Sequence, residues 1–203
     1  MRISPSTIVT QSPHRGFTVN AGSLTPCCRN SLDAVIDRVL YMTATYPSVM
    51  AIMITFKFPQ DVSYELGNSY MVRTMNSLGR YLGYNGLPFH YVWVPEISED
   101  GGGHFHLCLL IATNRQETLY IVAGKLQEYW AGALGISHAD GLVHYGTLGN
   151  GNIIRQGAPG FIQARDALIY HASYLTKTNT KSHLPPYSKG FGASQMPRAN
   201  PVI

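Results

Sequence analysis

The sequence predicts an α+β fold, and three observations lead to that class. The chain has 203 residues, 45% hydrophobic and 13% charged, a balance typical of one globular domain rather than a disordered chain. Short apolar runs with the character of strands alternate with segments in which apolar residues recur at the i, i+3, i+4 spacing of helices. Their order, strand, helix, strand, strand, helix, strand, is that of a ferredoxin-like (RRM-like) βαββαβ core.

The first half of the chain predicts an arm, a helix, a strand and a second helix. Residues 1–30 are rich in Ser, Thr, Pro and Gly and show no sustained period, so we expect an extended arm. An N-terminal helix is expected from Ser31, as its N-cap, to just before Pro47. Residues 50–58 form a continuous apolar run typical of a central strand, and residues 63–82 show a weaker helical period.

The middle of the chain predicts an antiparallel hairpin followed by a helix. Residues 89–97 and 104–112 are strand-like runs separated by a turn rich in glycine. Asn114 and Glu117 resemble a capping box, and the helix that they begin is expected to stop at Gly135. We expect each core helix to cross one face of an antiparallel sheet and to leave the other face free for a site.

The last part predicts two short strands and a helix that carries tyrosines. Residues 142–148 and 152–155 have strand character, and the final helix is expected over 163–178. We therefore expect one domain over residues 31–184, followed by an extended tail over 185–203 that is rich in Gly, Ser, Pro and Asn.

Charge and composition limit the classes of protein that this chain can belong to. The formal net charge is +4, with basic residues gathered toward both ends, where they suit contact with nucleic-acid phosphates. No apolar stretch approaches the roughly 20 residues that span a bilayer, and no signal-peptide core follows the N-terminus. The three cysteines lack the spacing of a disulfide framework. We expect a cytoplasmic protein without membrane contact, whose DNA-binding residues include Arg165, Lys181 and Lys189.

His104 and His106 are candidate metal ligands. Alternate side chains of a strand share a face, so the two imidazoles point one way and Phe105 the other. If the hairpin turns near Asp100, Glu96 lies across from His104 and points to the same face. Such a set suits Mn²⁺ or Mg²⁺, with Zn²⁺ as a further possibility. Histidines at this spacing are also common without a metal, so the prediction depends on Glu96.

Tyr170 and Tyr174 are candidate nucleophiles. They are four residues apart on one face of the predicted helix, with His171 beside them and Lys177 one turn later. A phenol is a weak nucleophile at neutral pH unless a cation or a metal stands nearby, and Lys177 can provide that charge. Tyrosines at this spacing also commonly pack the edge of a core. We expect Tyr174 to be the main nucleophile and Tyr170 at most a second one.

Together these motifs resemble the HUH endonuclease superfamily, in its rolling-circle replication-initiator branch, and most closely the initiators of filamentous phages and related prophage elements (YagK/YfjJ-like). The resemblance rests on Glu96, on the His-x-His strand and on the Tyr-x-x-Lys that begins at Tyr174. Residues 54–56 and 189–194 add weaker matches, so the likeness covers about 50–194.

The resemblance implies site-specific nicking and joining of single-stranded DNA, or of an origin hairpin, through a 5′-phosphotyrosine, to initiate rolling-circle replication of a phage, prophage or plasmid. It implies that Tyr174, Tyr170 and Lys177 are catalytic, and that Glu96 takes the place of a third histidine found in relaxases. Aromatic residues such as Tyr91 or Trp93 are candidates to stack bases. The sequence holds no P-loop, so a host helicase and polymerase are the expected partners.

Two alternatives to a replication initiator stay open, and a third is weakened by the sequence. A transposase-type HUH strand transferase has the same active site, so the sequence does not separate it from an initiator. A catalytically inactive DNA-binding regulator of the same fold would keep the basic ends without needing the tyrosines. A cupin-like oxygenase would require a glutamate a few residues after the second histidine, and residues 107–113 contain none.

Overall fold

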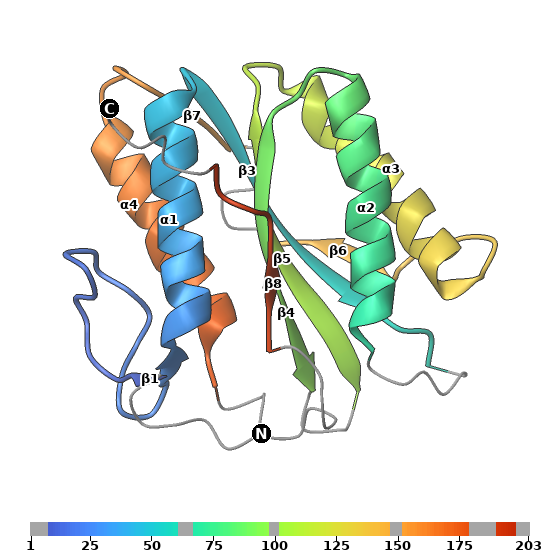
Figure 1. The fold of residues 1–203 in the computed structure, drawn as a ribbon, viewed down its shortest axis with the longest axis horizontal. Helices are drawn as coiled ribbons and strands as arrows, with labels where there is room; N and C mark the ends of the chain where they lie inside the picture. Colours follow the sequence, from blue (N-terminus) through green and yellow to red (C-terminus); the bar gives the residue numbers. More distant parts are fainter. Residues whose placement is uncertain (1–7, 61–66, 98–101, 147–151, 179–189, 198–203) are drawn as a thin grey trace.

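The computed structural model describes residues 8–60, 67–97, 102–146, 152–178 and 190–197. These residues form a mixed α+β fold with a small N-terminal sheet and a larger antiparallel sheet between two layers of helices (Figure 1). The α+β class expected from the sequence is confirmed. The small sheet contains β1 (Ile8–Val9) and β2 (Cys27–Cys28). The helices are α1 (Arg29–Thr45), α2 (Asn68–Tyr84), α3 (Glu117–Leu134) and α4 (Phe161–Ser173), and the 3-10 turn η2 (Tyr174–Thr176) follows α4.

The larger sheet has the strand order β6–β3–β5–β4–β8, and β7 pairs with β3 beside β6. Every pairing in it is antiparallel. The β4–β5 hairpin places Glu96 opposite His104, which is the register expected from the sequence. The strands are β3 (Ser48–Lys57), β4 (Phe89–Ile97), β5 (Gly103–Ala112), β6 (Val143–Tyr145), β7 (Asn152–Arg155) and β8 (Gly192–Ala193).

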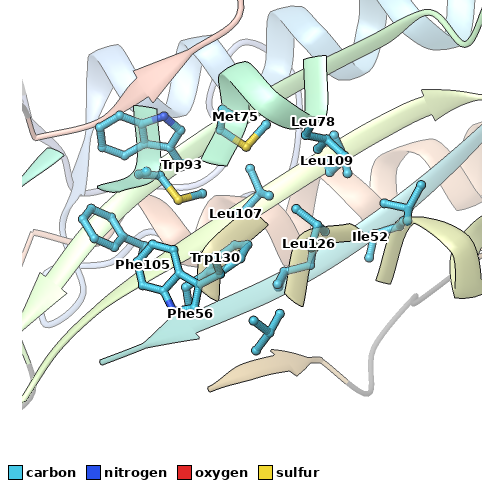
Figure 2. Packing of buried hydrophobic residues seen from close by; sticks show 14 of the residues in the cluster. Ile52, Phe56, Met75, Leu78, Trp93, Phe105, Leu107, Leu109, Leu126 and Trp130 are labelled. Carbon is cyan, nitrogen blue, oxygen red and sulfur yellow. The ribbon is translucent and has the colours of Figure 1, made fainter. Parts of the chain in front are cut away.

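Helices α2 and α3 cover one face of the sheet and enclose an apolar core (Figure 2). The alternation of β5 directs Phe105 and Leu107 into this layer, where they are fully buried. Trp130 of α3 lies among them, with its ring centroid 5.1 Å from that of Phe56. Its indole N–H donates to the carbonyl of Lys57 at 2.9 Å, so this buried polar group is satisfied.

We expected the opposite face of the sheet to be free, and this prediction is wrong. Helices α1 and α4 cover most of that face (Figure 1). Val39 of α1 and Ile169 of α4 pack there against Cys108 and Leu110 of β5. The apolar side of α1 explains why this face is covered, since an amphipathic helix outside the core unit must bury its apolar side against another element. His104 and His106 lie on this face next to the covered part, and both are half-buried.

Two predicted helix caps are wrong. Helix α1 begins before Ser31, with Cys28 as the N-cap, and the Ser31 hydroxyl donates to the Cys28 carbonyl at 3.1 Å. Helix α3 has Gln116 rather than Asn114 as its N-cap. The hydroxyl of Thr113, the residue after β5, accepts the N–H of Arg115 at 3.1 Å, so a local side-chain contact of Thr113 precedes the helix.

The last helix is shorter than the predicted 163–178, because α4 gives way at Tyr174 to a 3-10 turn. Parts of other predicted features lie outside the described residues. They are the start of the helix expected from 63, the turn at 98–101, the glycine-rich turn at 149–151 and most of the 185–203 tail. In the part of the chain that is described, no helix combines the length and apolar character needed to cross a membrane.

Residues of the predicted N-terminal arm pack onto α1. Val9, Val19 and Cys27 are buried in the same apolar cluster as the inner side of that helix. His14 Nε2 lies 2.8 Å from a carboxylate oxygen of Asp33 in α1, which adds a polar contact at the edge of the cluster.

Close to the C-terminus, β8 extends the sheet at the free edge of β4. Ser194 accepts the N–H of Tyr91 on its hydroxyl at 3.1 Å and donates its own N–H to the Tyr91 carbonyl at 3.1 Å. The guanidinium of Arg38, only 8% exposed, donates to the carbonyl of Ser194 and, at 3.0 Å, to that of Ala34. The imidazole of His90 lies 2.7 Å from the Ser194 hydroxyl. These contacts attach the tail segment to α1 and β4 together.

Gly192 is required for this attachment. A Cβ at this position would lie 2.6 Å from Nε1 of Trp93 and closer still to two carbons of the buried indole. We expect Gly192→Ala to displace β8 and to lower the free energy of unfolding by about 1–3 kcal/mol, as overpacking does. Gly124→Ala is the matched control, because its Cβ would meet nothing within 4 Å in α3 and alanine favours a helix. Equal stability of the two variants in chemical denaturation would contradict this role of Gly192.

The buried His90 makes stability depend on pH. Burial, and next the charge of Arg38, lower the pKa of His90 from 6.5 in the folded protein. As the pH falls below 6.5 the unfolded chain therefore binds a proton that the folded chain resists, and stability is lost. We expect His90→Asn to flatten this part of the profile of unfolding free energy, measured by denaturant titrations above and below pH 6.5. An unchanged slope in the variant would exclude His90 as its source.

Candidate active site

Glu96, His104 and His106 form a compact cluster of metal-ligating groups at the turn end of the β4–β5 hairpin. Nε2 of His106 lies 2.7 Å from Oε2 of Glu96, and Nε2 of His104 lies 3.5 Å from the same oxygen. The two Nε2 atoms are 3.1 Å apart. The side chains are 17–21% exposed, so solvent can reach them. The three side chains thus meet at one point, as the alternation and register predicted.

Thr55 orients one of these imidazoles. It pairs with His106 across β3 and β5, and its hydroxyl oxygen lies 3.0 Å from Nδ1 of His106. A contact of this kind to the second ring nitrogen fixes the ring so that Nε2 faces a metal. The sequence showed the run at 54–56 as a weak motif match without a role, and cross-strand pairing gives Thr55 one.

Cys108 is not part of the cluster, although it is on the same strand face as the histidines. The side chain packs in the apolar layer under α1 and α4. Burial raises the pKa of its thiol to about 12, so it remains protonated at neutral pH. Among the described residues, the ligand atoms that converge at the cluster come from Glu96, His104 and His106, and Cys108 is not one of them.

Tyr170 and Tyr174 line one pocket of about 460 Å³ on the same side of the sheet. Met53 of β3 also lines this pocket, and Gly146 beyond β6 donates its N–H to the Met53 carbonyl at 3.0 Å. Met53 precedes Thr55 by two residues, so the pocket lies one same-face step, about 7 Å, along β3 from the pair that holds His106. The tyrosines are 38% and 49% exposed. The fold therefore brings Tyr170 and Tyr174 to the sheet face that carries the histidines, with their pocket lined by Met53, two residues before Thr55.

The N-terminal segment holds the end of the tyrosine helix. The N–H of Asn20 donates to the hydroxyl of Ser173 at 2.8 Å, and that hydroxyl donates to the carbonyl of Tyr170 at 2.6 Å. The N–H of Thr178 donates to the carbonyl of Pro26 at 2.8 Å. Asn20 also lines the tyrosine pocket. These partners are some 150 residues apart in the chain, and no local motif of the sequence indicated them.

Lys177 contacts Tyr174, as expected, but through the ring. Its Nζ stands 3.6 Å from the centroid of the phenol ring, the geometry of a cation–π interaction. The ammonium therefore lies against the face of the Tyr174 ring.

The predicted DNA-binding residues have different environments. The guanidinium of Arg165 forms an ion pair with Asp166 at 2.8 Å and stands over the ring of Phe17, so part of its charge is already neutralised. Lys181 and Lys189 lie outside the described residues. Trp93, a predicted base-stacking residue, is 3% exposed, so this expectation is wrong. Tyr91 is half-buried and stacks on Phe89 with ring centroids 6.3 Å apart.

Comparison with known proteins gives one family and one relative. The family model described as YagK/YfjJ C-terminal domain matches residues 16–194. The Uncharacterized protein YagK of Escherichia coli (strain K12) is 29% identical over 119 residues, which cover 54% of this chain and 55% of that protein. The match thus spans about half the length of that relative. No solved structure matches the chain.

Proposed function

The chain belongs to the YagK/YfjJ C-terminal domain family, and we propose that it is a metal-dependent HUH endonuclease that nicks and joins single-stranded DNA through a tyrosine. The membership confirms the YagK/YfjJ part of the sequence resemblance. One observation carries the proposal: Glu96, His104 and His106 converge within 4.8 Å of one another beside a pocket lined by Tyr170 and Tyr174.

The ligand set fits a divalent cation. It offers one carboxylate oxygen and two imidazole nitrogens from two neighbouring strands, and Thr55 contacts the outer nitrogen of His106. Mixed oxygen and nitrogen donors suit Mn²⁺ or Mg²⁺, and Zn²⁺ accepts the same set. When bound, the cation would neutralise charge on the phosphate and draw electron density from phosphorus.

The chain supplies the nucleophile and its surroundings. The phenol oxygen of Tyr174 attacks the phosphorus, so an Oη–P bond forms while the bond from phosphorus to the 3′-oxygen breaks. Water takes the phenol proton and returns one to the 3′-oxygen, which leaves a free hydroxyl and a 5′-phosphotyrosine. Lys177, against the ring of Tyr174, adds positive charge where the pentavalent phosphorus develops negative charge. Attack of the 3′-hydroxyl on the phosphotyrosine reverses these steps and joins the strands.

The sheet supports a ferredoxin-like core for this enzyme. When β3, β4, β5 and the β6/β7 position are numbered in chain order, the strands lie in the order 4-1-3-2, with α2 and α3 as the crossover helices on one face. This arrangement matches a split βαβ core. Helices α1 and α4 are additions, and α4 with the following turn η2 carries Tyr170 and Tyr174 to the other face.

The direct test incubates the protein with Mn²⁺ and an end-labelled pool of single-stranded 40-mers of random sequence. We expect a labelled adduct that survives denaturant and disappears with chelator. DNA bound without any adduct would favour the inactive regulator instead. A rolling-circle initiator and a transposase-type transferase both yield the adduct, and sequencing the selected strands identifies the preferred DNA. We propose the initiator, with a host helicase and polymerase to unwind and extend.

A further inference from the structure

We infer that a groove beside the metal-ligating cluster binds the DNA strand that ends in the free 3′-hydroxyl, and keeps that strand in place for rejoining. The inference rests on the proposed function. The groove, here called the leaving-strand groove, has a volume of about 610 Å³ at the end of β3 and the start of β6. The lining residues that matter for its chemistry are Lys57, Phe58, Ser137, His138, Asp140 and His144.

Strand register aligns this groove with the candidate metal ligands. Lys57 pairs with His104 across β3 and β5. Thr55 pairs with His106 on one side and with His144 of β6 on the other. Paired residues of neighbouring strands point to the same face, as do residues two apart on one strand. Lys57 is therefore one strand spacing, about 5 Å, from the His104 position, and His144 is two spacings from that of His106.

The tyrosine pocket and the groove lie toward opposite ends of β3 relative to His106. Met53 lines the tyrosine pocket, Thr55 is level with His106, and Lys57 lines the groove. In phosphoryl transfer the attacking and leaving oxygens are roughly in line on opposite sides of phosphorus. If Tyr174 approaches from the Met53 side, the 3′-oxygen departs toward Lys57. The nucleotides that precede the cut then continue into the groove.

The side chains of the groove suit a nucleotide strand. Within the described residues, Lys57 and His144 are exposed and their side chains have no hydrogen-bond or ion-pair partner. The ammonium of Lys57 can contact a backbone phosphate, whereas the ring of Phe58 packs against Trp130 in the core and forms the apolar floor of the groove. Asp140 is the one carboxylate among the lining residues, and it can accept hydrogen bonds from base amino groups. These contacts combine backbone attraction with base recognition.

The test uses Lys57→Gln/His144→Gln as a double variant and Lys125→Gln as the matched control. Lys125 is a lysine of α3, which packs on the other face of the sheet, and its side chain pairs with Glu128 and lies over the rings of Tyr81 and Tyr129 at the surface. Thermal melting verifies that the wild type, the double variant and the control variant fold alike. Two measurements follow: anisotropy of fluorescein-labelled (dT)12 without metal, and the ratio of covalent adduct to rejoined product on the random single-stranded pool with Mn²⁺.

We expect the double variant to bind (dT)12 about tenfold more weakly than the wild type, an effect the size of one or two lost contacts. Because the upstream fragment then escapes before it can rejoin, the adduct should accumulate about threefold or more while the rejoined product falls. The control should match the wild type in both measurements. If the double variant instead loses adduct and rejoined product together, the two side chains support the structure of the site, and the strand-retention role is overturned.

The possible failures are separable. Wild-type affinity and a wild-type ratio in the double variant would overturn the groove and leave the nicking function standing. Adduct lost with (dT)12 affinity intact would assign Lys57 and His144 to the chemical step, which also overturns strand retention. No adduct from the wild-type protein would overturn the proposed function, and the groove with it.

Discussion

Tyr174→Phe is expected to abolish the covalent DNA adduct, reducing its yield by about a thousandfold or more, since in the proposed mechanism this residue supplies the atom that bonds to phosphorus. The substitution removes a single oxygen from a side chain that is 49% exposed. The ring that receives Lys177 is retained, so the 3-10 turn and its contacts should persist. Melting temperature and Mn²⁺ affinity should stay at wild-type values, and a denaturing gel of labelled single-stranded DNA measures the adduct.

Tyr170→Phe is the matched control, because Tyr170 lines the same pocket one helical turn earlier. We expect it to give the first adduct at wild-type yield and, if it has any effect, to impair a second strand transfer. Full adduct from Tyr174→Phe with none from Tyr170→Phe would reverse the assignment. Adduct lost only in the double variant would mean that either tyrosine can attack.

The metal-ligating cluster was predictable because its geometry is local. Strand alternation has a period of two, and a hairpin fixes which residues face each other, so Glu96 and His104 had to meet once the turn was recognised. The apolar partners of β5 were predictable for the same reason. Both inferences require only the residues of one hairpin.

The tyrosine pocket depends on contacts that sequence patterns do not contain. Helical periodicity continues smoothly past Ser173, yet the helix ends there, and a hydrogen bond from Asn20 holds its last turn. The partners are far apart in the chain, and neither residue type is unusual. In sequence the N-terminal residues resemble a polar arm. The structure shows that Val9, Val19 and Cys27 of this arm are buried in the apolar cluster beneath α1. Non-local pairing of this kind is set by tertiary packing.

The leaving-strand groove could not be predicted from the sequence, for a related reason. Strand β6 has three residues, Val143–Tyr145, too few for alternation to fix its register. The expected fold class did not give the register of this strand either, and only its observed pairing with β3 places His144 level with His106. The sequence therefore predicted the candidate metal ligands of the hairpin, whereas the surfaces around them depend on the order and register of the strands.

Replacing both histidines, His104→Ala/His106→Ala, is expected to abolish Mn²⁺ binding measured by calorimetry, with affinity lowered more than about a hundredfold. The double variant leaves only the carboxylate of Glu96 in the cluster, and one carboxylate at 21% exposure cannot compete with hydration of the cation. Both side chains lie outside the two apolar clusters, so the fold should persist.

Two further variants grade this effect. Thr55→Val keeps the shape of the side chain but removes the hydroxyl 3.0 Å from Nδ1 of His106, and loss of such an orienting contact typically weakens metal affinity tenfold to a hundredfold. His144→Gln should leave Mn²⁺ affinity unchanged, because His144 stands two strand spacings from His106. Retained affinity in the double histidine variant, or loss of affinity in His144→Gln, would place the metal elsewhere, at His144 or His171. The order expected from the geometry is the double variant weakest, Thr55→Val intermediate, and His144→Gln equal to the wild type.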